Sequence, residues 1–146
     1  MNLDLLEMLG SGANGMIDSS LLGPLEGYQA ASAAAFGMTL MMLGEQLDRA
    51  VENLCDENAA LRELFGRAAP SVGGTLADRL ERAAAGRDET LRISALKTVN
   101  DGLRALLIDL HVRVEEAGGE LADFETAIWS ELVRSTERRQ VAVAPF

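Results

Sequence analysis

Apolar residues recur at helical spacing along a first long stretch of the chain, from about Pro24 to Ala69. They return alternately after three and four positions, which is typical of a helix with a coiled-coil-like seam. Pro24 is tolerated in a first helical turn, whereas Pro70 predicts the end of the helix because it lacks an amide donor. The seam positions are Ala30, Ala33, Gly37, Leu40, Gly44, Leu47, Val51, Leu54, Asn58, Leu61 and Phe65.

The seam of this helix changes character along its length. Its early half holds small residues, among them Gly37 and Gly44, which would let another helix approach closely. Its later half holds zipper-like leucines, among them Leu54 and Leu61, interrupted by the polar Asn58. We therefore predict that these five positions, together with Asn100 and Leu103 further along the chain, lie at an oligomer interface.

A second stretch with the same pattern runs from about Asp88, a possible N-cap, to Ala117, where two glycines stop it. Asn100 interrupts its seam as Asn58 interrupts the first, and Leu103 follows three residues later. The seam positions are Ile93, Leu96, Asn100, Leu103, Leu107, Leu110 and Val114. The two segments of the form L-x-x-x-N-x-x-L-R-x-L are either an internal repeat or two independent solutions to one packing problem.

Shorter helices complete the pattern. Thr75 and Asp78 resemble a capping box for a short helix that ends near Gly86. A last helix over roughly 120–140 is predicted to be anchored by Trp129. Its apolar face holds Leu121, Phe124, Ile128, Trp129, Leu132 and Val133. Residues 1–22 form a flexible or short-helix segment, with the helix over residues 2–9, and residues 141–146 form an apolar tail.

Residues 10–15, GSGANG, match the glycine spacing of a dinucleotide-binding turn. That turn works only between a strand and a helix of a parallel sheet, and no strand-rich region follows in this chain. We therefore interpret these residues as a flexible turn.

The two asparagines raise a question of pairing. An amide within an apolar seam costs stability unless a second amide faces it and shares its hydrogen bonds. Such a pair penalises misaligned registers, so Asn58 and Asn100 are predicted to set alignment and helix number. They could face each other within one chain, or each could meet its own copy across a two-fold axis. A connector in one chain barely spans the return of roughly 35 Å between parallel helices. We therefore favour self-pairing of at least one asparagine, which predicts a homodimer.

Composition supports a helical fold. Of the 146 residues, 48% are hydrophobic and only 4% aromatic, so the core is aliphatic, which suits helices better than sheets. We predict one all-α domain over residues 1–146, a helical bundle with two or three long helices plus short ones.

The formal charge of −10 is unevenly distributed. Residues 1–48 hold six acidic residues and neither Lys nor Arg, whereas the rest of the chain is nearly balanced. Because an acidic chain repels phosphates, no nucleic-acid partner is expected. No positively charged region opens the chain, so we expect no signal peptide and a cytoplasmic location.

Residues 27–44 carry no charge and reach the lower edge of a membrane-spanning length. Both flanks are acidic, and Ala is frequent within the stretch, which argues against a membrane span. We predict a helix that is buried on most sides.

The chain offers few groups for catalysis. Its single cysteine, Cys55, excludes an intramolecular disulfide, and its single histidine, His111, excludes an ordinary zinc or copper centre. Ile108 stands three residues before His111, so the Glu-x-x-His motif of di-iron bundles is missing. We expect no enzymatic activity, no cofactor and no metal site.

Arg134, Arg138 and Arg139 cluster before the apolar tail that ends at Phe146. Basic residues in a last turn suit the helix dipole. A sharper hypothesis is that the arginines hold an acidic patch of a partner while the tail, with Phe146, packs into a groove.

Two functions remain open. The first is a non-catalytic homodimeric bundle that acts as an interaction protein, either an adaptor or an accessory subunit. The second is a binding module for a small apolar ligand such as an acyl chain, which six methionines support because Met lines adaptable apolar surfaces. Fold alone does not decide between them.

Overall fold

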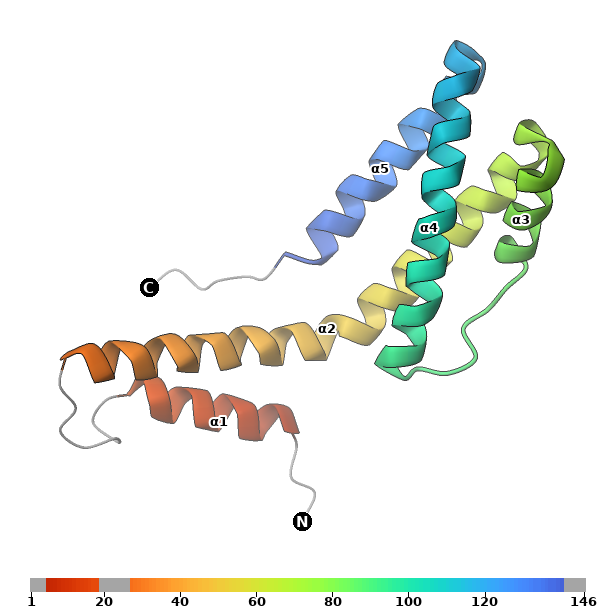
Figure 1. Cartoon of the computed structure of the whole chain (residues 1–146). Coiled ribbons are helices and arrows are strands. Elements are labelled where there is room, and N and C mark those ends of the chain that lie inside the picture. The colour runs from red at the N-terminus through yellow and green to blue at the C-terminus, as the bar shows by residue number, and fades with distance from the viewer. Residues whose placement is uncertain (1–4, 19–26, 141–146) are drawn as a thin grey trace. The chain divides into compact units, whose positions relative to one another are not determined.

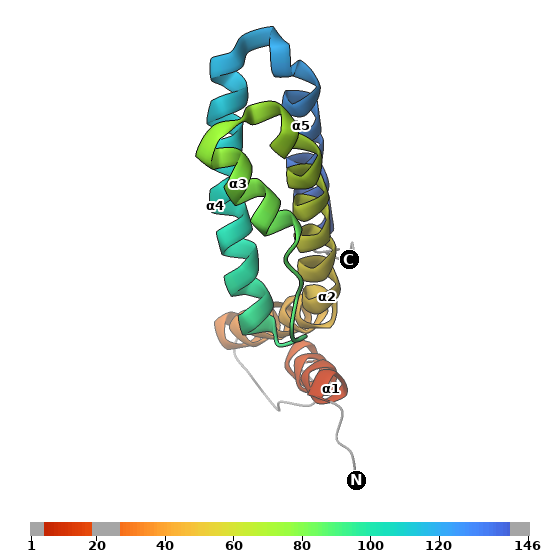
Figure 2. The same ribbon diagram turned by 90° about the vertical axis from the view of Figure 1, so that its right-hand side faces the viewer.

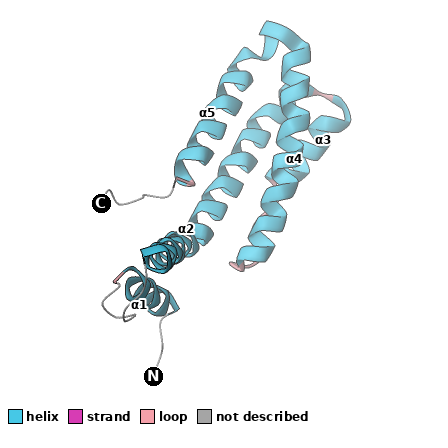
Figure 3. Ribbon diagram, turned by 60° about the vertical axis from the view of Figure 1, so that its left-hand side comes forward, coloured by secondary structure: helices cyan, strands magenta, loops and turns pink. Residues whose placement is uncertain are grey.

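A computed structural model describes residues 5–18 and 27–140 of the chain, and only the backbone of Leu5. These residues form helices and no strand, which confirms the predicted all-α class (Figures 1 and 3). The elements are α1 (Leu5–Ile17), α2 (Gly27–Val72), α3 (Gly74–Ala84), α4 (Ile93–Ala117), the 3₁₀ helix η2 (Gly118–Leu121) and α5 (Ala122–Arg138). The apolar tail over residues 141–146, including Phe146, lies outside the described residues.

The glycine-rich segment near the N-terminus is helical. Gly10, Gly12 and Gly15 all lie within α1, so the predicted flexible turn over residues 10–15 is wrong. Gly10 and Gly15 are partly buried, and Ala13 between them is fully buried, because this face packs on another helix. Tertiary packing of this face has outweighed the low helix propensity of glycine.

The long helix α2 extends beyond its predicted end. It includes Pro70 and continues to Val72, three residues past Ala69. Proline here disturbs only the last turn, and the buried side chain of Val72 holds that turn in the core. The helix ends where Gly73 and Gly74 adopt φ values of 66° and 63°, a region that favours glycine.

The predicted caps of α3 and α4 are not formed. Gly73 is the N-cap of α3 and makes no side-chain cap bond, so the Thr75–Asp78 capping box is absent. Arg92, not Asp88, precedes α4. The predicted end of α4 at Ala117 is confirmed, and Gly118 follows it with a φ of 59°.

The contacts of the chain fall into two compact units, both of which include part of α2. We call the unit formed within residues 1–49 the hairpin unit and Ala50–Gln140 the bundle unit. That they act as one domain stays a prediction.

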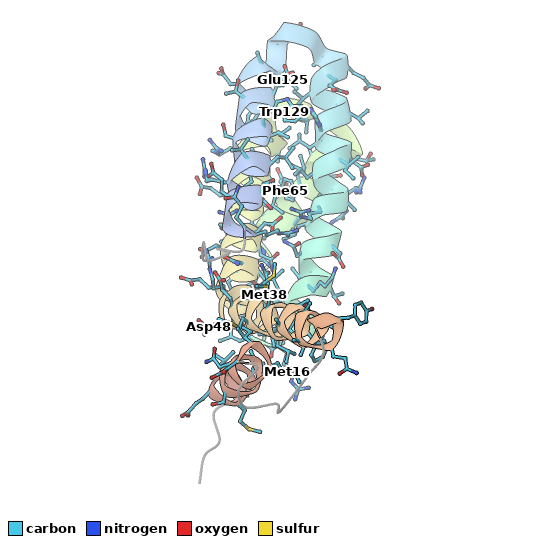
Figure 4. All side chains as sticks on the ribbon, turned by 90° about the vertical axis from the view of Figure 1, so that its left-hand side faces the viewer. Met16, Met38, Asp48, Phe65, Glu125 and Trp129 are labelled. Atoms are coloured by element: carbon cyan, nitrogen blue, oxygen red, sulfur yellow. The ribbon has the colours of Figure 1, made fainter. Side chains whose placement is uncertain are left out.

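In the bundle unit, the C-terminal part of α2 lies beside α3, α4 and α5 (Figure 2). α2 and α4 run in the same direction, and α3 and α5 run opposite to them (Figures 1 and 2). The core is aliphatic, as predicted, apart from Phe65, which lies between the helices (Figure 4). Its buried members are Leu61, Leu64, Phe65, Ala68, Ala69, Val72, Leu80, Leu103, Leu106, Leu107, Leu110, Val114, Leu121 and Ile128.

The predicted apolar face of the last helix is confirmed in part, because Leu121, Phe124, Ile128 and Leu132 pack in the core. Ile128 is fully buried, but Trp129 is 53% exposed and Val133 is also exposed. Glu131 and Ser135 are also buried: Ser135 accepts a hydrogen bond from Arg104 of α4, and Glu131 pairs with Arg138 of α5 itself. Trp129 therefore does not anchor α5 in the core.

In the hairpin unit, α1 packs against the N-terminal part of α2. A Cβ atom on Gly37 would lie 2.7 Å from the carbonyl oxygen of Ala13, so glycine is needed for this approach. At Gly44 a Cβ would meet nothing within 4 Å. The predicted close approach thus occurs at Gly37, where the neighbour is α1 of the same chain.

The uncharged stretch over residues 27–44 is not buried on most sides, contrary to prediction. Phe36, Met41, Met42 and Leu43 are exposed, because α1 covers only one side of α2 here. Within the described parts of the chain, no helix has both the length and the apolar character needed to cross a membrane.

Candidate functional site

Asn58 and Asn100 meet inside the bundle unit of one chain. The Asn100 Nδ2 group donates to Asn58 Oδ1 at 3.0 Å, and both residues are buried. Asn58 Nδ2 donates in turn to Asp88 Oδ1 at 3.1 Å and to the Leu96 carbonyl oxygen at 3.4 Å. Of the two pairings considered from the sequence, the structure shows the pairing within one chain.

This pairing needs α2 and α4 to run in parallel, which the connection achieves. α3 runs back alongside the end of α2, and residues 86–92 then continue without helix to the start of α4 (Figure 2). That extended segment covers more distance per residue than a helix does. The chain therefore spans the distance from the end of α2 back to the start of α4, which the sequence suggested was barely possible.

Asp88 belongs to the amide pair instead of capping a helix. Its Oδ1 atom accepts from Arg62 NH2 at 2.7 Å as well as from Asn58. The hydrogen bond from Arg62 lowers the pKa of Asp88 below its ordinary value, against the opposing effect of burial. We call Asn58, Asn100, Asp88 and Arg62 the amide network.

Glu57 forms a second polar centre, between α2, α4 and the end of α5. Its side chain is 4% exposed, and its two oxygens accept from Arg104 Nε and Arg139 NH2, each at 2.6 Å. Burial favours a raised pKa, but the hydrogen bonds from both arginines outweigh it and lower the pKa of Glu57. Arg104 also donates to Ser135 Oγ at 2.7 Å.

Glu131 is held in the same manner on α5. Arg138 pairs with one of its oxygens, and Arg134 NH1 lies 3.6 Å from the other. The Arg138 carbonyl oxygen accepts from Asn53 Nδ2 at 3.1 Å. Arg138 and Arg139, predicted to dock a partner, are thus engaged with buried carboxylates of their own chain. The guanidinium of Arg134 stays largely exposed.

The predicted interface leucines belong mostly to the core of one chain. Leu61 and Leu103 are buried in the bundle unit, and Leu54 is partly buried. Because α4 of the same chain covers this seam, Leu61 and Leu103 offer no surface to a second copy. Their place in an interface between copies therefore has no support in the fold of one chain.

Cys55 lies near Asp88 of the amide network, whereas His111 lies against Trp129 of α5. Burial, followed by the nearby charges of Asp88 and Asp56, raises the pKa of Cys55, which keeps the thiol protonated and weakly reactive. The His111 ring meets Trp129 edge-on at 5.5 Å, and its Nε2 atom lies 3.7 Å from Glu115. In residues 5–18 and 27–140, no three His, Cys, Asp or Glu side chains are grouped to hold a metal ion.

A hollow of about 280 Å³ opens on the hairpin unit between α1 and α2. Its lining combines glycine backbone, apolar side chains and two carboxylates. The lining residues are Leu6, Gly10, Leu40, Met41, Gly44, Glu45 and Asp48. Glu45 pairs with Arg49 at 3.4 Å, and Asp48 is exposed (Figure 4). Hollows of similar volume, about 270 and 300 Å³, lie on the bundle unit, but the hollow of the hairpin unit is the one next to the exposed apolar side chains of α2.

The amide network predicts a measurable dependence of stability on acid. The pKa of Asp88 is lower in the folded protein than in the unfolded chain, where it is about 4. Its carboxylate therefore stabilises the fold at a pH above about 4, and this contribution is lost as the pH falls through the pKa of the folded protein. We expect Asp88→Asn to lower the free energy of unfolding by about 1–2 kcal/mol at neutral pH. The gap from the parent protein should close below about pH 4. Urea unfolding at several pH values checks this, and a gap that stays constant would contradict it.

Comparison of the chain with protein-family models, with curated proteins and with solved structures finds no match.

Proposed function

We propose that this protein is a non-catalytic interaction protein, an adaptor or accessory subunit. In this proposal the bundle unit is a stable scaffold and the hairpin unit carries the contact surface. The observation behind it is the exposed apolar face of α2 in the hairpin unit. The large apolar side chains exposed on this face are Phe36, Leu43 and Leu47, and Tyr28, Met41 and Met42 are exposed on other sides of the same helix.

The clustering of these side chains supports the proposal. Single exposed apolar residues are normal on protein surfaces, but contiguous apolar patches mark sites of interaction. Phe36, Leu43 and Leu47 lie seven and four residues apart, which puts them on one face of the helix. An amphipathic partner helix buries a face of this kind.

The structure removes the argument that led from the sequence to a homodimer. Its original argument was self-pairing of Asn58 or Asn100, but these two amides bond to each other within one chain. A second copy could still cover the apolar face of α2, and native mass spectrometry of the purified protein would reveal a dimer.

The alternative function, binding of an acyl chain, has less support. The hollow of about 280 Å³ lies just below the size of typical small-molecule pockets, roughly 300–1,000 Å³. An acyl chain also ends in an anionic or polar group, and the carboxylates of Glu45 and Asp48 line the same hollow. A helix surface matches the site better.

Photo-crosslinking in cells tests the proposed function. A photoreactive amino acid at Leu43, 48% exposed, is expected to give a discrete cross-linked band. The matched control is the same replacement at Ile108, which is 64% exposed on α4 of the bundle unit. A band of twice the chain mass would identify a second copy, and another mass a different partner. Equal patterns at both positions would refute a contact surface on the hairpin unit.

A further inference from the structure

The hollow of the hairpin unit is an open depression of about 280 Å³, with room for one long side chain. Gly10 and Gly44 contribute no side chains, and a Cβ built on either would meet nothing within 4 Å. Leu6, Leu40 and Met41 line the same space with apolar surface. A side chain inserted here would therefore bury its stem against apolar atoms without displacing the hairpin.

The carboxylates that line the hollow favour a positive charge at the tip of that side chain. Asp48 and Glu45 both line the hollow, and Asp48 is exposed to solvent. Lysine and arginine bury an aliphatic stem while they keep a cation near acidic groups or water. Glu45 already pairs with Arg49, but a leucine would fill only the apolar part of the hollow and bring no charge to the exposed Asp48. The lining thus favours a cationic side chain with a long stem.

The surroundings of the hollow indicate that this side chain comes from a helix. Phe36, Leu43 and Leu47 are exposed next to Leu40 on one face of α2. They extend over three helical turns, about 16 Å, which matches one face of a short amphipathic helix. Leucines of that helix would cover the exposed stripe while a basic residue enters the hollow.

Charge favours a different protein over a second copy. Residues 1–48 hold six acidic residues and no Lys or Arg, so the hairpin unit of another copy brings like charge. All 13 basic residues of a second copy lie beyond residue 48, and eight of them are paired with carboxylates of their own chain. Arg62 binds Asp88, Arg79 binds Asp109 and Arg104 binds Glu57.

We propose that the hairpin unit binds an amphipathic helix of another protein that carries lysines or arginines beside a leucine-rich face. This inference rests on the proposed function and adds the chemistry of the partner. Association depends on charge, so it weakens as salt screens the carboxylates.

Two synthetic helical peptides of about 18 residues test the proposal, since that length gives five turns. They share one leucine face and carry only lysine or only glutamate on the polar face. Each is labelled and titrated with the full chain by fluorescence anisotropy. The lysine peptide is expected to bind at least about tenfold more tightly than the glutamate peptide, because every tenfold corresponds to 1.4 kcal/mol.

Variants locate the binding. Gly44→Leu fills the hollow and is expected to weaken the lysine peptide about tenfold, and Asp48→Asn to weaken it about threefold. The matched control is Gly102→Leu on α4, where a Cβ also meets nothing within 4 Å. Its affinity should equal that of the parent, and circular dichroism checks that all variants stay helical.

Three outcomes would overturn the inference. Equal affinity for the two peptides would show that the partner need not be basic. An unchanged affinity of Gly44→Leu for the lysine peptide would show that the hollow is not the binding site. Sedimentation velocity could also show a dimer of the parent protein. If Gly44→Leu dissociates that dimer and addition of the lysine peptide does not, a second copy is the occupant of the hollow. In each case a band specific to Leu43 in the crosslinking experiment would leave the proposed function standing.

Discussion

Glu57→Ala is expected to lower the free energy of unfolding by about 3 kcal/mol. The carboxylate is 4% exposed and holds Arg104 and Arg139, which reach it from α4 and from the end of α5. Removing one partner of a buried ion pair costs roughly 3–5 kcal/mol because the remaining charge loses its compensation. Both guanidinium groups are partly exposed, so we expect the lower end of that range.

Urea unfolding followed by circular dichroism measures this loss. Glu63→Ala is the matched control, because Glu63 is an exposed glutamate on the same helix, six residues away. An exposed substitution of this kind changes stability by less than about 0.5 kcal/mol. Equal losses for the two variants would show that Glu57 does not hold α4 and α5 to α2.

The helical fold was predictable because its signal is periodic. The leucine seams of α2 and α4 repeat over several turns, and their parts from Leu61 and from Leu103 onward form core in the bundle unit. The end of α4 at Ala117 was predictable because Gly118 adopts a positive φ there. The helix predicted over residues 2–9 overlaps the start of α1, but its continuation to Ile17 was not predictable, because three glycines suggest a turn and packing against Gly37 of α2 stabilises the helix. Contacts between elements far apart in sequence decide such cases.

The ion pair between Glu57 and Arg104 could have been predicted from the heptad pattern. With Asn58 and Asn100 at equivalent seam positions, Glu57 and Arg104 occupy the flanking positions that form ion pairs between parallel coiled-coil helices. Asp88 carried no such signal. It resembles a helix cap in the sequence, and only the path of residues 86–92 brings it to Arg62.

The exposed face of α2 was also beyond sequence reasoning. An uncharged stretch of helix is compatible with burial inside one chain, in a membrane or against a partner. Only the position of α1, which covers one side of that helix, shows which apolar residues remain exposed.

Asn58→Leu is expected to destabilise the bundle unit by about 2 kcal/mol, although it replaces a polar group in a seam by an apolar one. The substitution removes the acceptor of Asn100 Nδ2 and a donor to Asp88, and both Asn58 and Asn100 are buried. A buried polar group left without its partner costs about 1–3 kcal/mol, which outweighs the gain from added apolar surface.

A double-mutant cycle separates this cause from a simple loss of packing. In Asn58→Leu/Asn100→Leu no amide is left unpaired, so the double variant should be more stable than the sum of the single effects predicts, by about 1–2 kcal/mol. Asp88 keeps Arg62 as its partner in every variant. Native mass spectrometry of the same proteins should show one unchanged chain count, because the pair lies within one chain. Additive effects, or a change in chain count in the single variants, would instead mean that each asparagine meets its own copy.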